Sequence, residues 1–108
     1  MAYSESDLNF ILDQLSGIPE ISHKRMFGGI GFFHQDRMFG MIGGGIFRLK
    51  VNESNMADYK TRGMTPFTMG SQGKELPYWE VPLDVLEDRS LLTEWAMKSV
   101  AVAHKSKK

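Results

Sequence analysis

Apolar residues recur at helical spacing near both ends of the chain. Near the start, an i, i+3, i+4, i+7 stripe predicts a helix that begins at Ser4 and ends before Gly17 and Pro19. This stripe consists of Leu8, Ile11, Leu12 and Leu15. Near the end, Ser90 is placed to cap a last helix with a broad apolar face. That face consists of Leu91, Leu92, Trp95, Ala96, Val100 and Ala103.

Between these helices, apolar and polar residues alternate with the period of two that is typical of β-strands. The alternation predicts strands over residues 21–26, 30–34, 37–42 and 46–51, with turns at 35–37 and 43–45. A second hairpin is expected from strands over 65–69 and 75–81 around a turn at 70–73. Two short helices are predicted over 54–62 and 83–87, with Gly63 ending the first and Pro82 in the first turn of the second.

The order helix, four strands, helix, two strands, helices predicts the α+β class. We expect two layers, an antiparallel sheet of about six strands with the first and last helices on one of its faces. Successive hairpins leave two unpaired sheet edges, and such edges are natural pairing sites. Homodimerisation through an edge is therefore an expectation.

The segment 24–51 is unusually rich in Gly and aromatic residues, and the triplet Met-Phe-Gly occurs in it twice, at 26–28 and at 38–40. It does not fit a phosphate-binding loop, because no Gly-Lys-Ser/Thr sequence follows the glycines and no third Gly completes a dinucleotide fingerprint. The glycines are better explained as turns, bulges or places where something packs close to the backbone.

Several short motifs follow one another in a fixed order along the chain. They are Lys24-Arg25-Met26-Phe27-Gly28-Gly29, Asp36-Arg37-Met38-Phe39, Phe47-Arg48-Leu49-Lys50-Val51, Gly63-Met64-Thr65-Pro66-Phe67, Pro77-Tyr78-Trp79-Glu80-Val81-Pro82 and Leu86-Glu87-Asp88, with Tyr59 and Trp95-Ala96. Their order and spacing together resemble the N-terminal domain of the TfoX family. The resemblance extends from about Leu8 to Val102. It implies a two-layer fold related to secretion-chaperone-like domains. Longer members of the family carry a second domain and are bacterial regulators of competence for DNA transformation.

Length and composition are those of an ordinary globular domain. At 108 residues we expect one domain over 1–108, with a disordered basic tail at 104–108. Cysteine is absent, which excludes disulfides and thiolate metal ligands. The start of the chain lacks the basic and apolar regions of a signal peptide, and no stretch is long enough to span a bilayer. We therefore expect a cytoplasmic protein that does not bind membranes.

The 13 basic residues are balanced by 13 acidic ones. A domain that binds DNA through phosphate neutralisation is expected to be clearly basic, so direct DNA binding is disfavoured. A local patch stays open, because five bases could share one face of the sheet. These bases are Lys24, Arg25, Arg37, Arg48 and Lys50.

The sequence offers no catalytic set. The three histidines, His23, His34 and His104, lack the spacing of a helical zinc site, so no catalytic residue, metal or cofactor is predicted. Ser71 lacks the context of a nucleophile elbow and is explained as a turn residue. The acidic residues near the last helix are explained as helix capping. They are Asp84, Glu87 and Asp88.

Arg25 is the central residue of the candidate binding site. In one interpretation it forms an internal ion pair with Glu80. In the other it stands at the mouth of an anion-binding or partner-binding groove with Phe27, Gly28, Gly29, Tyr78 and Trp79. A soft methionine surface is a further possibility. Its members are Met38, Met41, Met64 and Met69.

Three classes of function follow. The favoured hypothesis is a non-enzymatic regulatory or protein-interaction module, with a protein partner or a second copy as its ligand. The second is a DNA-associated transcriptional or competence regulator. The third is a small-molecule or anion-binding domain, or an unrecognised enzyme, that uses Arg25 with His23 and Tyr78. It requires a pocket that joins these groups.

Overall fold

The computed structural model describes residues 5–26, 28–69 and 73–105. The predicted order of elements is confirmed, with boundaries that differ from the predicted ones by one or two residues at several ends. The helices are α1 (Glu5–Gln14), α2 (Met56–Lys60), α3 (Leu83–Leu86) and α4 (Arg89–Lys105). The strands are β1 (Ile21–Met26), β2 (Gly29–His34), β3 (Arg37–Gly43), β4 (Ile46–Lys50), β5 (Pro66–Met69) and β6 (Lys74–Glu80).

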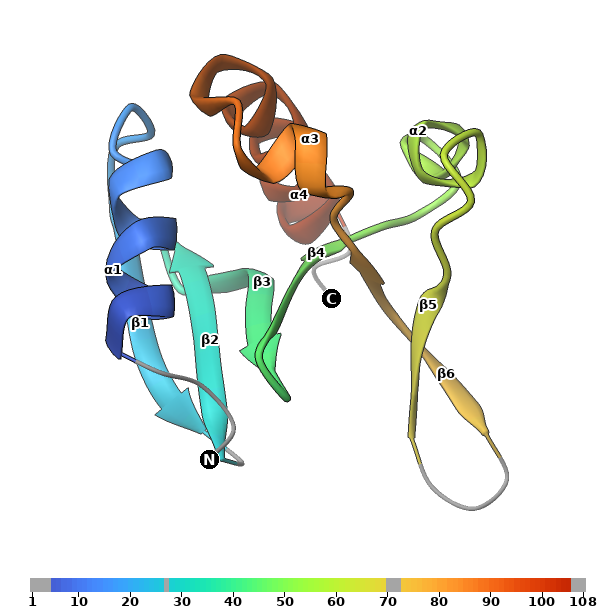
Figure 1. Cartoon of the computed structure of the whole chain (residues 1–108), viewed down its shortest axis with the longest axis horizontal. Coiled ribbons are helices and arrows are strands. Elements are labelled where there is room, and N and C mark those ends of the chain that lie inside the picture. Colours follow the sequence, from blue (N-terminus) through green and yellow to red (C-terminus); the bar gives the residue numbers. More distant parts are fainter. Residues whose placement is uncertain (1–4, 27, 70–72, 106–108) are drawn as a thin grey trace.

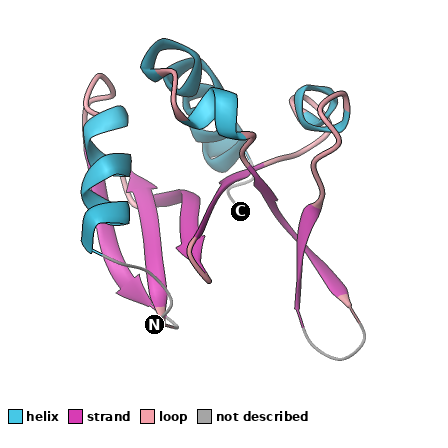
Figure 2. Cartoon of the chain, in the orientation of Figure 1, coloured by secondary structure: helices cyan, strands magenta, loops and turns pink. Residues whose placement is uncertain are grey.

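The six strands form one antiparallel sheet in the order β1-β2-β3-β4-β6-β5 (Figures 1 and 2). The first four strands are a meander, as predicted from the alternation. The second hairpin joins this meander through β6, its later strand, so β5 lies at the outer edge. The β5–β6 hairpin projects away from the helices (Figure 1). The two edges of the sheet are therefore β1 and β5.

The helices pack against one face of the sheet, as expected for a two-layer α+β domain. Figure 1 shows α1 beside β1 and β2, with α3 and α4 next to it. The stripe of α1 contributes Ile11 and Leu15 to the core, and α4 contributes the fully buried Leu92 and Ala96. From the sheet, the core takes alternate residues of the strands. They include Ile30, Phe32, Ile42, Phe47, Leu49 and Trp79.

A β-bulge interrupts the pairing of β2 with β3. The register passes from Phe32 opposite Gly40 to Phe33 opposite Met38, so Phe39 is an extra residue in β3. Phe39 is completely buried. Because the extra residue shifts the alternation by one, Met38 and Met41 come to lie on the same face of the sheet although they are three positions apart.

The ends of α4 differ from the sequence prediction. The helix begins at Arg89, and the backbone N–H of Leu91 donates a hydrogen bond of 3.1 Å to the Asp88 carboxylate. Asp88 is therefore the N-cap, and the prediction of Ser90 was wrong because both residues are good caps and the sequence does not choose between them. At the other end, His104 and Lys105 belong to the helix, which corrects the predicted tail from 104. The rest of that tail, 106–108, lies outside the described residues.

Several sequence predictions fall on residues outside the described ranges. The Ser4 cap of α1, the Ser71 turn and most of the 70–73 turn lie outside the described residues. The helix predicted over 54–62 is shorter, and the chain leaves it through Gly63, whose φ of +74° suits glycine at a helix end. No helix within 5–26, 28–69 and 73–105 is both long enough and apolar enough to cross a membrane.

Candidate functional site

The two glycines that follow Arg25 have different roles: one forms a turn, and the other makes room for a strand of the same protein. Gly28 occupies the turn between β1 and β2 with φ of +77°. A Cβ at Gly29 would collide with the backbone carbonyl of Ile42 in β3. The close approach that the sequence indicated is therefore made by the protein's own backbone at Gly29. Phe27 lies outside the described residues.

Arg25 lies on the edge strand β1, opposite Ile30, and its side chain is exposed. The strand order places β2, β3 and β4 between β1 and β6, so Arg25 and Glu80 are separated by about 19 Å at the usual spacing of strands. The predicted ion pair between them was wrong. The cross-strand partner of Glu80 is Arg48, in the neighbouring strand β4.

Tyr78 and Trp79 are consecutive in β6 and therefore point to opposite faces of the sheet. Trp79 is 8% exposed and packs in the core against Tyr59, with 6.1 Å between the ring centroids. Tyr78 lies on the other face, where its hydroxyl donates a long hydrogen bond of 3.5 Å to the Met38 carbonyl. Burial raises the pKa of Tyr78 above its usual value.

The predicted residues thus do not form one groove. Arg25 with Gly28 and Gly29 belongs to one edge of the sheet, Trp79 to the core, and Tyr78 with Glu80 to the face away from the helices. His23 and Arg25 are both on β1, far from Tyr78. The pocket that the anion-binding hypothesis required is not formed, because the sheet order separates its proposed members.

What the structure does bring together is an apolar surface on the sheet face opposite the helices, which we call the open face. It includes six half-buried apolar or aromatic side chains. They are Met26, Phe33, Met38, Met41, Phe67 and Tyr78. The sulfur atoms of Met26 and Met38 and the ring of Phe33 converge above Gly31, which leaves the space that they fill.

The sequence indicated part of this surface. Met38 and Met41 of the proposed methionine surface are on it, but the other two members are not shown there. Met64 packs against the core, and the side chain of Met69 is outside the description. Met26 and Phe33 could have been assigned to this surface from the period-two alternation that predicted the strands. Residues that alternate with core residues lie on the opposite face of the sheet.

Arg48 is the best-fixed cation of the open face. Its guanidinium lies 4.3 Å from the centroid of the Phe67 ring and donates a hydrogen bond of 3.3 Å to the Gly43 carbonyl. Burial lowers the pKa of Arg48, and the charge of Glu80 acts in the opposite direction. Two lysines of the predicted basic patch, Lys24 and Lys50, share the face, whereas Arg25 points to its other side, so the patch is smaller than the sequence allowed.

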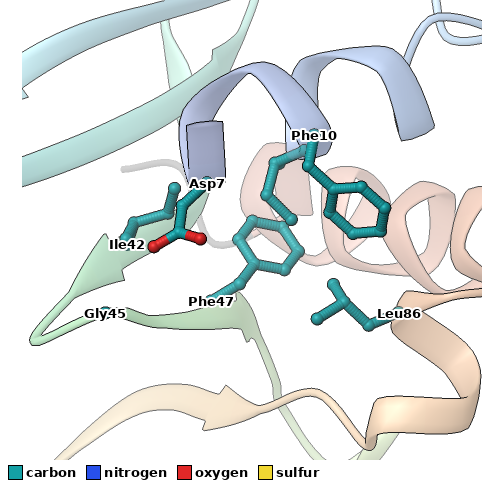
Figure 3. A pocket seen from close by; sticks show the side chains of 7 residues that line it. Asp7, Phe10, Ile42, Gly45, Phe47 and Leu86 are labelled. Atoms are coloured by element: carbon teal, nitrogen blue, oxygen red, sulfur yellow. The ribbon is translucent and has the colours of Figure 1, made fainter. Parts of the chain in front are cut away.

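A shallow hollow lies on the helical side, between α1, the β3–β4 turn and α3 (Figure 3). Its volume is about 300 Å³, open to solvent. Its lining is mainly apolar and holds a single ionisable side chain. The lining residues are Asp7, Phe10, Ile11, Ile42, Gly45, Phe47 and Leu86. Figure 3 shows the Asp7 carboxylate at the side of Ile42 and the Phe10 ring facing Leu86.

Each of the three histidines contacts another ring of the domain. His34 at the end of β2 and His104 in the last turn of α4 approach to 3.0 Å between Nδ1 and Nε2, with their rings nearly perpendicular. His23 instead lies beside Phe32, 6.3 Å between ring centroids. Within the described ranges, no group of three or more His, Cys, Asp or Glu side chains is close enough to hold a metal ion.

A model of one protein family matches residues 13–103, which includes all six strands and nearly all of α4. The model is described as the TfoX N-terminal domain. The chain belongs to the TfoX N-terminal domain family. No curated protein matches the chain.

The matched part of this TfoX N-terminal domain contains the whole open face and the edge strand β1. It also contains most of the hollow, except Asp7, Phe10 and Ile11 on α1. The family is not a known enzyme family.

Proposed function

We propose that this TfoX N-terminal domain is a non-enzymatic regulatory module that acts by binding another protein through its open face. The observation that carries the proposal is the one-sided covering of the sheet. Helices bury one face, while the other includes six half-buried apolar and aromatic side chains on β1, β2, β3, β5 and β6. Arg48 and Lys50 of β4 lie between the side chains of β1–β3 and those of β5–β6.

The composition of the open face fits protein recognition. Met and aromatic side chains are enriched at the centres of protein interfaces, and methionine adapts its shape to a partner. Arg48 is held in place by Phe67 and the Gly43 carbonyl, so it is ordered before a partner arrives and loses little conformational freedom on binding. The resemblance to competence regulators supports a regulatory role for such binding.

Photo-crosslinking tests the proposal with a matched pair of positions. The photoreactive residue p-benzoylphenylalanine is placed at Phe33 or at Tyr78 on the open face, and at Phe10 on α1 as the control. Phe10 is an aromatic residue that is 42% exposed on the helical side. Irradiation in the native cells is expected to give the same protein adduct from both open-face positions and none from Phe10.

An adduct from Phe10 alone would move the interaction to the hollow beside α1, and the absence of adducts at all three positions would refute the proposal.

The competing DNA-associated role makes a separate prediction. It requires affinity for duplex DNA that falls steeply with salt concentration. Such binding, lost when Lys24 and Lys50 are changed to Gln, would favour that role over protein binding.

A further inference from the structure

The two edges of the sheet differ in their ability to accept another strand. β5 has four residues, begins with Pro66, and pairs with β6 in an irregular register between Pro66 and Thr68. Proline and irregular pairing both block the addition of a strand. β1 has six residues, contains neither Pro nor Gly, and keeps a regular register with β2 from Ile21 to Met26. Only the β1 edge is therefore built to continue the sheet.

The side chains of β1 give this edge a charge. His23, Lys24 and Arg25 are consecutive and exposed, and the strand has no acidic residue. None of the ion pairs among the described residues includes Lys24 or Arg25. The nearest acidic residue before the strand, Glu20, accepts a hydrogen bond from the Gln35 amide. The edge thus presents the outer backbone groups of β1 together with basic side chains that form no ion pair with any residue the structure describes.

We propose that β1 binds an extended acidic segment of a partner protein as a seventh strand. The proposal rests on the protein-binding role above and adds the chemistry of the partner. Backbone hydrogen bonds along β1 would supply the general affinity, and the bases would select the sequence. Because Lys24 and Arg25 point to opposite sides of the sheet, consecutive acidic residues in the partner would meet one base on each side.

A second copy of the same chain is a poorer occupant of this edge. Antiparallel pairing of β1 with another β1 would bring His23, Lys24 and Arg25 of one copy next to the same residues of the other. Like charges directly opposite one another destabilise a strand pair. The Lys24 ammonium also lies 5.6 Å from the centroid of the Phe33 ring, so the acidic segment would run beside the open face.

The test uses the purified full chain and two capped seven-residue peptides. The acidic peptide is Thr-Val-Glu-Glu-Glu-Val-Thr, and its control has Lys in place of each Glu. In 50 mM salt we expect the acidic peptide to bind at least tenfold more tightly than the control, and its affinity to fall as salt screens the charges. Amide hydrogen exchange of residues 21–26, followed by NMR, should slow when the acidic peptide is added.

Charge-matched variants locate the binding. Lys24→Glu with Arg25→Glu should weaken the acidic peptide at least tenfold and favour the lysine peptide. The control, Lys60→Glu with Lys74→Glu, makes the same change in net charge at two exposed positions off β1 and should leave the affinity within twofold. Circular dichroism should show that both variants are folded. N-methylation of alternate backbone nitrogens of the acidic peptide, tried in both registers, should abolish binding in one register.

Three results would overturn the proposal: equal binding of the two peptides, equal loss in the two variants, or binding without slower exchange in 21–26. The crosslinks from Phe33 and Tyr78 do not depend on these peptides. If the crosslinks form while the acidic peptide fails, the open face remains the binding site and only the strand addition is wrong. If both fail, the protein-binding function itself is wrong.

Discussion

The sulfur atoms of Met26 and Met38 lie over the same backbone position, Gly31. A Cβ at Gly31 would stand 2.8 Å from the Met26 sulfur and 3.4 Å from the Met38 sulfur. These two methionines open the two Met-Phe-Gly triplets of the sequence. The repeated triplet thus has a spatial counterpart: its first residues come from β1 and β3 and meet above the strand between them.

This arrangement predicts different effects for alanine at two neighbouring glycines. The Cβ of Gly31→Ala meets the flexible ends of two methionine side chains, which can move aside, and the edge of the Phe33 ring at 3.2 Å. The free energy of unfolding should therefore fall by no more than about 1 kcal/mol. The Cβ of Gly29→Ala meets the Ile42 backbone carbonyl, which can move only if β3 moves. This substitution should lower the free energy of unfolding by about 2–3 kcal/mol. Urea unfolding measures both, and similar values for the two would contradict the packing described.

The His34–His104 contact joins the end of β2 to the last turn of α4 at 3.0 Å. A double-mutant cycle with His34→Ala and His104→Ala should give a coupling of about 0.5–1.5 kcal/mol in the free energy of unfolding. The control cycle replaces His34→Ala by His23→Ala, since His23 lies beside Phe32. That cycle should be additive within about 0.5 kcal/mol. A coupling near zero in the first cycle would show that the contact does not stabilise the fold.

The Tyr59 hydroxyl is buried and has no hydrogen-bond partner among the described residues. Burial raises the pKa of Tyr59 well above its usual value, against the smaller opposite effect of the Ser99 hydroxyl, which itself donates a 2.7 Å hydrogen bond to the Lys50 carbonyl. Tyr59→Phe removes an unsatisfied polar group and should leave the free energy of unfolding unchanged or raise it by about 1 kcal/mol.

Ser99→Ala is the matched comparison for Tyr59→Phe, because it removes a hydroxyl that is bonded. It should lower the free energy of unfolding by about 1 kcal/mol. Thermal or urea unfolding of the two variants measures the contrast. A clear loss of stability in Tyr59→Phe would mean that the hydroxyl has a partner, and the neighbouring Ser99 hydroxyl is the candidate.

The Arg62 guanidinium donates a hydrogen bond to the Asp84 carboxylate, and this holds the pKa of Asp84 below its ordinary value of 3.8. Because the folded pKa is the lower one, the stabilisation is present above the unfolded pKa and is lost as the pH falls through the folded value. Arg62→Gln should therefore raise the pKa of Asp84 towards 3.8, as measured by NMR titration of its carboxyl carbon.

The control for this titration is Arg89→Gln, which breaks the exposed pair of Arg89 with Asp13 and should leave the pKa of Asp84 unchanged. Both pairs are largely exposed, so neither variant should change the overall stability much. An unchanged Asp84 pKa in Arg62→Gln would show that the pair does not persist in solution.

The α+β class, the order of the elements and most of the core were predictable from the sequence alone. These follow from local periodicity. The i, i+3, i+4, i+7 stripe that includes Ile11 and Leu15 gives a single apolar face when the segment is a helix. The alternation over 46–51 gives a single apolar face when the segment is a strand. The resemblance drawn from the motifs also agrees with the family match over residues 13–103. Each of these inferences uses residues that are close together in the chain.

The way in which distant residues combine became clear from the folded domain and not from the sequence. In the sheet order, β6 pairs with β4 and β5 lies at the edge. This order separates Arg25 from Glu80 and places Glu80 opposite Arg48. The bulge at Phe39 placed Met38 and Met41 on one face, against strict alternation. Helix α4 brought His104 to His34. Strand order, register and helix docking are set by the packing of the whole domain. A local pattern of residues therefore does not predict them.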